Sequence, residues 1–190
     1  MKTKSTPALS LADVTAARAR LAHGLRLTPC SLAPALSDIA GMRIWLKRDD
    51  LQRTGSFKER GALHALLCLT DAERACGVIA ASAGNHALGL AYHSAQLGVR
   101  VTVVMPVNAP AVKIARCRSL GAEVVLHGDS FEEALAAAHA RAVSTGETSI
   151  HPFDDPRVIA GQGTMALEIL EQAPTLDTIV VPVGGGGLLA

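Results

Sequence analysis

Apolar and polar positions follow two rhythms along this chain, one typical of helices and one typical of strands. Leu11, Val14 and Leu21 lie on one face of a helical pattern, and Ser10 before them is a residue type that begins helices. Residues 43–47 then alternate polar and apolar side chains, as a half-buried strand does. The N-terminal part therefore predicts a helix followed by a strand.

From residue 56 onward, predicted helices and strands follow one another with short connections. The predicted helices cover 56–68, 86–97, 111–120, 131–144 and 164–172, and the predicted strands cover 77–81, 99–105, 123–126 and 178–183. Helical segments of this length join parallel strands through right-handed crossovers. The predicted fold class is therefore α/β, with mainly parallel sheets and helices on both faces.

Composition excludes several classes of protein. The chain has 190 residues, of which 49% are hydrophobic, and a net charge of +1, so it can bury a core but offers no basic surface for nucleic acid or an anionic membrane. It lacks a stretch with the apolar length of a secretory signal or a membrane span, so we expect a cytoplasmic protein. The scattered cysteines and histidines show no metal-ligand spacing, and we expect reduced thiols and no metal.

Three loops carry unusual residues: 54–61, 82–86 and Gly184–Gly187. In parallel sheets, ligands collect at the carboxyl ends of strands, next to the N-termini of helices. We expect the three loops to form one site.

Gly184–Gly187 follow an apolar run at 178–183. Bare backbone N–H groups at the start of a helix favour an anion such as phosphate. A flexible turn is the alternative interpretation, and Gly185–Ala190 also fits the spacing of a dinucleotide-binding fingerprint. Because the helix expected after these glycines would lie beyond Ala190, we expect the chain to be the N-terminal portion of a longer protein.

Lys58 is the candidate catalytic residue of the first loop. Ser56 with Glu59 three positions later fits a capping box, which places Lys58 in the first turn of a helix. The positive end of the helix dipole lowers the pKa of an amine there, and a partly neutral amine attacks carbonyl carbons. A solvated surface lysine is the alternative, and we expect Arg60 beside it to be an ordinary surface cation.

The second loop, Ser82–His86, follows an apolar strand. A serine hydroxyl, an asparagine amide and several backbone N–H groups can hold a carboxylate, and the Asn85 amide can donate to an aromatic hydroxyl. Helix capping alone is the alternative for the serine and the asparagine. A histidine at a helix start, as at His86, is more often structural than catalytic.

Five segments resemble, in order, the signatures of the pyridoxal-phosphate-dependent threonine dehydratases. They read GSFKERG at 55–61, ASAGNHA at 81–87, HPFDDP at 151–156, IAGQGT at 159–164 and VPVGGGGL at 181–188. The resemblance implies the fold type II arrangement of the tryptophan synthase β type. In that arrangement a small α/β subdomain at 76–154 is inserted into a larger cofactor-binding subdomain at 1–75 and 155–190, truncated after the phosphate loop.

The resemblance also implies roles for the residues that bind pyridoxal 5'-phosphate. Lys58 would bind the cofactor's aldehyde and act as the catalytic base, and Phe57 would pack beside it. Asn85 would donate to the phenolic oxygen, while Gly184–Gly187 and Leu188 would hold the phosphate. The substrate carboxylate would dock at the second loop, at Ser82, Ala83, Gly84, Asn85 and His86.

The function implied is that of a threonine ammonia-lyase, which converts L-threonine to 2-oxobutanoate and ammonia in isoleucine biosynthesis or threonine catabolism. The resemblance implies a homo-oligomer, a dimer or tetramer, for the full-length protein and poor activity for the isolated chain. L-Serine and 3-hydroxyaspartate dehydratases remain alternatives. Ala83 stands where serine racemases carry a second serine that acts as a base, which makes racemisation less favoured. His86 stands where cysteine synthases typically carry threonine, which makes replacement of a β-substituent less favoured. A non-catalytic nucleotide-binding or structural fragment is the alternative of a different class.

Overall fold

The computed structural model describes residues 9–190. The N-terminal part contains α1 (Leu11–Leu21), β1 (Cys30–Leu32), α2 (Pro34–Ala40), β2 (Trp45–Lys47) and the 3-10 helix η1 (Asp49–Leu51). The middle part contains α3 (Lys58–Leu67), α4 (Asp71–Cys76), β3 (Val78–Ala81), α5 (Asn85–Leu97), β4 (Val101–Met105), α6 (Ala111–Ser119), β5 (Glu123–Leu126), α7 (Phe131–Thr145) and β6 (Thr148–Ser149). Helix α8 (Pro156–Gln172) follows. The predicted α/β class is confirmed.

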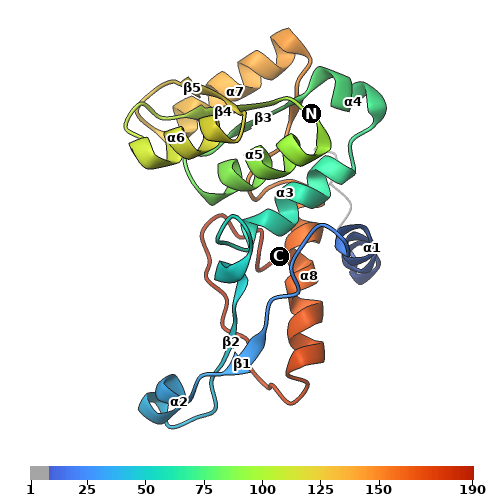
Figure 1. Ribbon diagram of the computed structural model, residues 1–190, viewed down its shortest axis with the longest axis vertical. Helices are drawn as coiled ribbons and strands as arrows, with labels where there is room; N and C mark the ends of the chain where they lie inside the picture. Colours follow the sequence, from blue (N-terminus) through green and yellow to red (C-terminus); the bar gives the residue numbers. More distant parts are fainter. Residues whose placement is uncertain (1–8) are drawn as a thin grey trace, which may run out of the picture.

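A four-stranded parallel sheet forms the upper part of Figure 1, with strand order β5-β4-β3-β6. Successive side chains of a strand point to opposite faces. Val78 and Ala80 of β3 pack in one apolar cluster with α3, α5 and α6. Ile79 and Ala81 pack in a second cluster with α7. Helices therefore cover both faces, as the nearly continuous apolar sequences of β3 and β4 predict.

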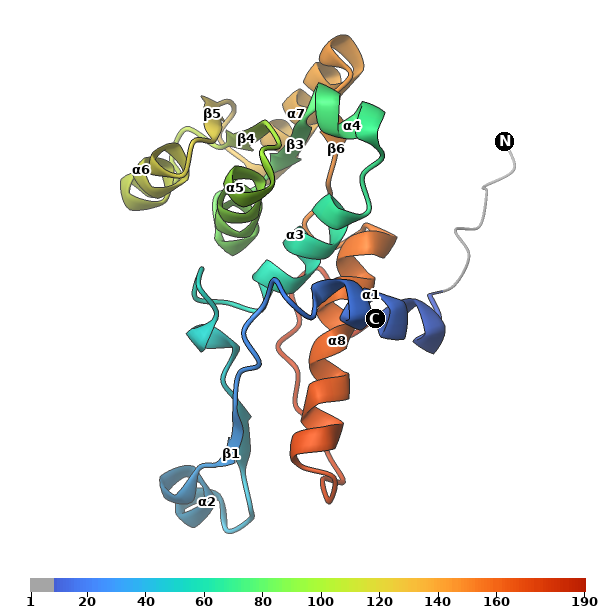
Figure 2. The ribbon, with the colours of Figure 1, turned by 45° about the vertical axis from the view of Figure 1, so that its right-hand side comes forward.

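Helix α3 lies between this sheet region and α8, and packs against both α5 and α8 (Figures 1 and 2). The two helices α3 and α8 cross at Gly61 and Gly161. A Cβ atom on Gly161 would lie 2.7 Å from Gly61 Cα and 2.8 Å from the Arg60 carbonyl oxygen. Only glycine permits this close approach. The crossing holds the N-terminal turn of α3 against α8.

Beside α8, the antiparallel pair β1–β2 and helix α2 extend toward the lower end of the molecule (Figure 1). Lys47 of β2 joins this ribbon to α8, because its amine donates to Gln172 Oε1 at 3.0 Å and pairs with Glu168 at 2.5 Å. The ribbon is therefore attached to α8 by buried polar contacts.

Arg60 is wholly buried, so the expectation of a surface cation is wrong. Its guanidinium forms bidentate ion pairs with Asp49, at 2.5 and 2.8 Å, and with Glu168, at 2.6 and 2.9 Å. The guanidinium also donates to the Thr164 hydroxyl, and the Thr28 hydroxyl donates to the Asp49 carboxylate. Two carboxylates neutralise the charge, which is how a buried arginine is tolerated.

Two local predictions need correction. Residues 178–183 form no strand: no strand pairs with them in the described part of the chain, and Val180 is 91% exposed. A strand is stable only beside a partner strand, and none of the described residues supplies one there. The last helix begins at Pro156 rather than Thr164, with Asp155 as its N-cap. The short elements α2, α4, β1 and β6 also form without a pattern strong enough to predict them.

None of the helices within residues 9–190 combines the length and the apolar character needed to span a bilayer.

Candidate active site

Lys58 is the first residue of α3, as predicted, and its side chain is half-buried. Its amine donates a hydrogen bond to the carbonyl oxygen of Pro152 at 2.8 Å and lies 5.4 Å from the centre of the Phe57 ring. Burial lowers the pKa of Lys58, because desolvation disfavours the charged amine. The alternative of a freely solvated surface lysine is therefore wrong.

The capping interaction predicted for this helix start is different in the structure. Ser56 Oγ is buried and has no hydrogen-bond partner in the described part of the chain. Glu59 instead accepts hydrogen bonds from the Thr54 backbone N–H at 2.7 Å and hydroxyl at 3.0 Å. The sequence spacing suggested serine as the partner, but the loop turns so that the threonine two residues earlier reaches the carboxylate.

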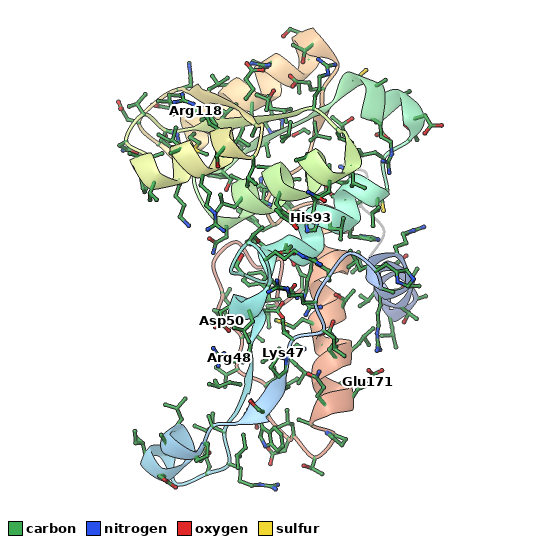
Figure 3. All side chains as sticks on the ribbon, in the orientation of Figure 1. Lys47, Arg48, Asp50, His93, Arg118 and Glu171 are labelled. Atoms are coloured by element: carbon green, nitrogen blue, oxygen red, sulfur yellow. The ribbon has the colours of Figure 1, made fainter. Side chains whose placement is uncertain are left out.

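Glu59 also connects the Lys58 helix to α5. His93 Nε2 on α5 lies 3.3 Å from the buried Glu59 carboxylate, and Figure 3 places His93 where α5 meets α3. Burial alone would raise the pKa of Glu59, but the nearby His93 ring and the hydrogen bonds from Thr54 outweigh it and hold that pKa below its usual value. The residue next to Lys58 is therefore an ionised anchor between the two helices.

His86 is 2% exposed and neutral. Burial, followed by the charge of nearby Lys58, lowers the pKa of His86 to about 3. His86 Nε2 lies 3.3 Å from the carbonyl oxygen of Ile150, which can only accept, so Nε2 carries the proton and Nδ1 does not. The ring holds the start of α5 against the segment that follows β6, which agrees with a structural histidine.

The other residues of the second loop are placed as follows. Ser82 Oγ accepts from the backbone N–H groups of Gly84, at 3.2 Å, and Ala87, at 3.4 Å. This hydroxyl therefore binds backbone N–H groups at the start of α5, as the capping interpretation predicts. Ala83 is half-buried against the main apolar cluster. Asn85 is exposed and accepts a hydrogen bond from Lys113.

The glycine loop packs against Phe153. A Cβ atom on Gly185 would collide with the Phe153 ring, and one on Gly187 would collide with the Phe153 backbone. Gly186 has a φ of 88°, in the left-handed region that favours glycine. Added Cβ atoms on Gly184 and Gly186 would meet nothing within 4 Å, so these two positions are open.

Residues 152–153 connect the first and third loops. Pro152 accepts the Lys58 hydrogen bond, and Phe153, the next residue, packs against the glycines. The His151 ring lies edge-on to Phe153, with ring centres 4.6 Å apart. The segment belongs to a motif identified in the sequence, but sequence reasoning gave it no role, because a backbone carbonyl leaves no signature in residue type.

A family model described as "Pyridoxal-phosphate dependent enzyme" matches residues 21–190. The chain belongs to this family. The resemblance stated from the five sequence segments is therefore confirmed, and the family's cofactor is pyridoxal phosphate.

Relatives of this pyridoxal-phosphate-dependent chain include the L-threonine ammonia-lyase of Thermotoga maritima, 47% identical over 96% of this chain and 45% of that protein. The catabolic L-threonine dehydratase TdcB of Escherichia coli strain K12 is 46% identical over 96% of this chain and 55% of that protein. The chain thus spans about half the length of these relatives.

Two solved structures have the same fold. The processed form of threonine deaminase isoform 2 from Solanum lycopersicum superposes with a TM-score of 0.88 at 42% identity, covering 94% of this chain and 49% of that one. Maize serine racemase superposes with a TM-score of 0.92 at 34% identity, covering 96% of this chain and 55% of that one. These similarities do not separate the two activities.

The residues present fit the family's cofactor. Lys58 provides an amine whose pKa is lowered by burial. The open glycines Gly184 and Gly186 leave backbone room where side chains would crowd an anion. The amide nitrogen of Asn85 makes no hydrogen bond to any described residue and remains available as a donor.

Proposed function

We propose that this chain is the cofactor-binding portion of a threonine ammonia-lyase, which converts L-threonine to 2-oxobutanoate and ammonia. The observation that carries the proposal is the half-buried Lys58 amine, held by Pro152 in the segment that packs on the glycine loop. Relatives at 46–47% identity that are named threonine ammonia-lyase or dehydratase support the choice of reaction.

In this proposal Lys58 binds the aldehyde of pyridoxal phosphate covalently, and Phe57 packs beside it. Asn85 donates to the phenolic oxygen, and the backbone N–H groups of Gly184–Gly187 and Leu188 hold the phosphate. When bound, the cofactor supplies an electron sink for the charge that develops at the substrate's α-carbon.

Lys58 also acts as the base. With substrate bound, its free amine would take the α-proton. Because burial lowers the pKa of Lys58, a larger fraction of this amine is neutral near pH 7. The α-proton and the β-hydroxyl that are lost together amount to one water, and addition of one water to the released enamine gives 2-oxobutanoate and ammonia. The protein's task is to orient the substrate and to keep one neutral amine near the α-carbon.

The substrate carboxylate docks at the second loop, at Ser82, Ala83, Gly84, Asn85 and His86. Because the His86 ring is turned into the core, His86 binds the carboxylate through its backbone N–H at the start of α5 rather than through its imidazole. The Ser82 hydroxyl already accepts two backbone hydrogen bonds and can still donate its own proton to a carboxylate oxygen.

Racemisation is the second candidate, favoured by the similarity to maize serine racemase. Ala83 argues against it, because alanine carries no proton that could be exchanged on the opposite face of the substrate. Serine and 3-hydroxyaspartate remain alternative substrates for the elimination.

The wider arrangement is also part of the proposal. The subdomains are 1–75 with 155–190 and the inserted 76–154. The full-length enzyme is a cytoplasmic homo-oligomer that acts on a small amino acid and binds neither nucleic acid nor membrane.

An assay of the complete gene product tests the reaction. We expect 2-oxo acid and ammonia to form from L-threonine with higher kcat/KM than from L-serine or 3-hydroxyaspartate, and we expect little D-serine from L-serine. A clear preference for serine would overturn the substrate assignment, and fast racemisation would overturn the reaction class.

A further inference from the structure

Lys113 makes a contact that the reaction as described does not use. It is the third residue of α6, and its amine donates to Asn85 Oδ1, on the first residue of α5, at 3.2 Å. Within residues 9–190 this is the only hydrogen bond of the Lys113 side chain, and the lysine forms no ion pair there. Helices α5 and α6 pack on the same side of the sheet, so the contact joins two neighbouring helix starts.

The chemistry of the two groups fixes the orientation of the Asn85 amide. An ammonium has three donors and no acceptor, so it can bond the amide oxygen but not the amide nitrogen. Asparagine oxygen and nitrogen are often hard to tell apart by shape, but here the donor-only partner decides between them. With Oδ1 held by Lys113, Nδ2 occupies the opposite side of the amide and keeps both of its protons free.

We propose that Lys113 is a positioning residue that holds the Asn85 amide so that Nδ2 donates to the phenolic oxygen of pyridoxal phosphate. The inference rests on the proposed function, because it assigns Asn85 to that oxygen. A flipped amide would present its own oxygen to the phenolic oxygen and replace an attraction by a repulsion between two acceptors. Lys113 thus acts through Asn85 and does not touch the reacting atoms.

Replacing Lys113 by methionine in the complete gene product removes the donor but keeps an unbranched side chain. We expect Lys113→Met to weaken pyridoxal phosphate binding by about tenfold, the usual effect of losing one hydrogen bond with a charged partner. The absorption maximum of the bound cofactor should shift as well, because the phenolic oxygen belongs to the chromophore. Lys113→Arg retains a donor-only side chain and should restore both properties.

Arg118→Met is the matched control. Arg118 lies on the same helix (Figure 3), and its exposed side chain has no hydrogen-bond or ion-pair partner in the described structure. The control removes the same charge, and it should leave cofactor affinity and absorption unchanged. An equal effect of both variants would mean that positive charge alone attracts the anionic cofactor, which would overturn the positioning role.

A double-mutant cycle identifies the residue through which Lys113 acts. In an Asn85→Ala background, Lys113→Met should have no further effect on affinity or absorption. A full effect in that background, or unchanged binding and absorption in Lys113→Met alone, would overturn the inference. If the wild-type protein fails to bind pyridoxal phosphate, the proposed function itself fails; wild-type binding with an unaffected Lys113→Met overturns only the inference.

Discussion

The amine of Lys58 donates to the carbonyl oxygen of Pro152, 94 positions later in the sequence, at 2.8 Å. The acceptor belongs to the segment 150–153. In this segment the Ile150 carbonyl contacts His86, and Phe153 packs against the glycine loop. One short segment after the parallel sheet therefore contacts all three loops of the candidate site. Changes in this segment should affect cofactor binding without altering any of the proposed cofactor-binding side chains.

Gly187→Ala should reduce the free energy of unfolding by roughly 1–3 kcal/mol, the usual cost of forcing an extra methyl into a packed place. The new methyl would collide with the Phe153 backbone, which cannot rotate away as a side chain can. Denaturant titration measures the effect. Gly184→Ala is the control, since its Cβ would meet nothing within 4 Å; equal losses in both variants would contradict the packing explanation.

Arg60→Met should destabilise the protein by about 3–5 kcal/mol, because it leaves the buried Asp49 carboxylate without its counter-charge and Glu168 with Lys47 alone. Its partners Asp49 and Glu168 come from η1 and α8, so the loss should also loosen α3 against α8. Arg48→Met is the comparison: its pair with Asp50 is exposed (Figure 3), and removal should cost at most about 1 kcal/mol. Similar losses in the two variants would show that the buried network contributes little.

His86 predicts a pH dependence of stability. The pKa of His86 is about 3 in the folded chain against 6.5 for the free side chain. The unfolded chain takes up this proton first, so the stabilisation present above pH 6.5 is lost as the pH falls toward 3. The variant His86→Gln should not show this contribution to the loss of stability at low pH. We expect the wild-type curve to fall faster than the variant's by about 1.4 kcal/mol per pH unit below about 6.5. Parallel curves for the two proteins would contradict the buried, neutral assignment.

The sequence predicted three of the four strands of the central sheet, β3, β4 and β5, because their signals are local. Nearly continuous apolar runs indicate β3 and β4, and helical periodicity after each of them indicates α5 and α6. The position of Lys58 at the start of α3 was also predictable, although the Glu59 carboxylate binds Thr54 rather than Ser56. The loop conformation, which the residue spacing does not specify, decides whether the Ser56 or the Thr54 hydroxyl reaches Glu59.

Features that depend on distant partners were not predictable. Arg60 has the sequence context of a surface cation, and its burial depends on Asp49 and on Glu168, which lies 108 positions later. Residues 178–183 have the composition of a strand, but a strand also needs a neighbour, which local sequence does not reveal. The Pro152 carbonyl carries no signal in residue type, since every residue has one.

The most direct test of the central claim is borohydride reduction of the complete gene product after incubation with pyridoxal phosphate, followed by peptide mapping. The account predicts one pyridoxyl group, on Lys58, and none on the protein when Lys58 is replaced by alanine. A non-catalytic fragment would carry no specific label. Label on another lysine, or unchanged labelling of the Lys58→Ala variant, would contradict the assignment of Lys58 as the cofactor-binding amine.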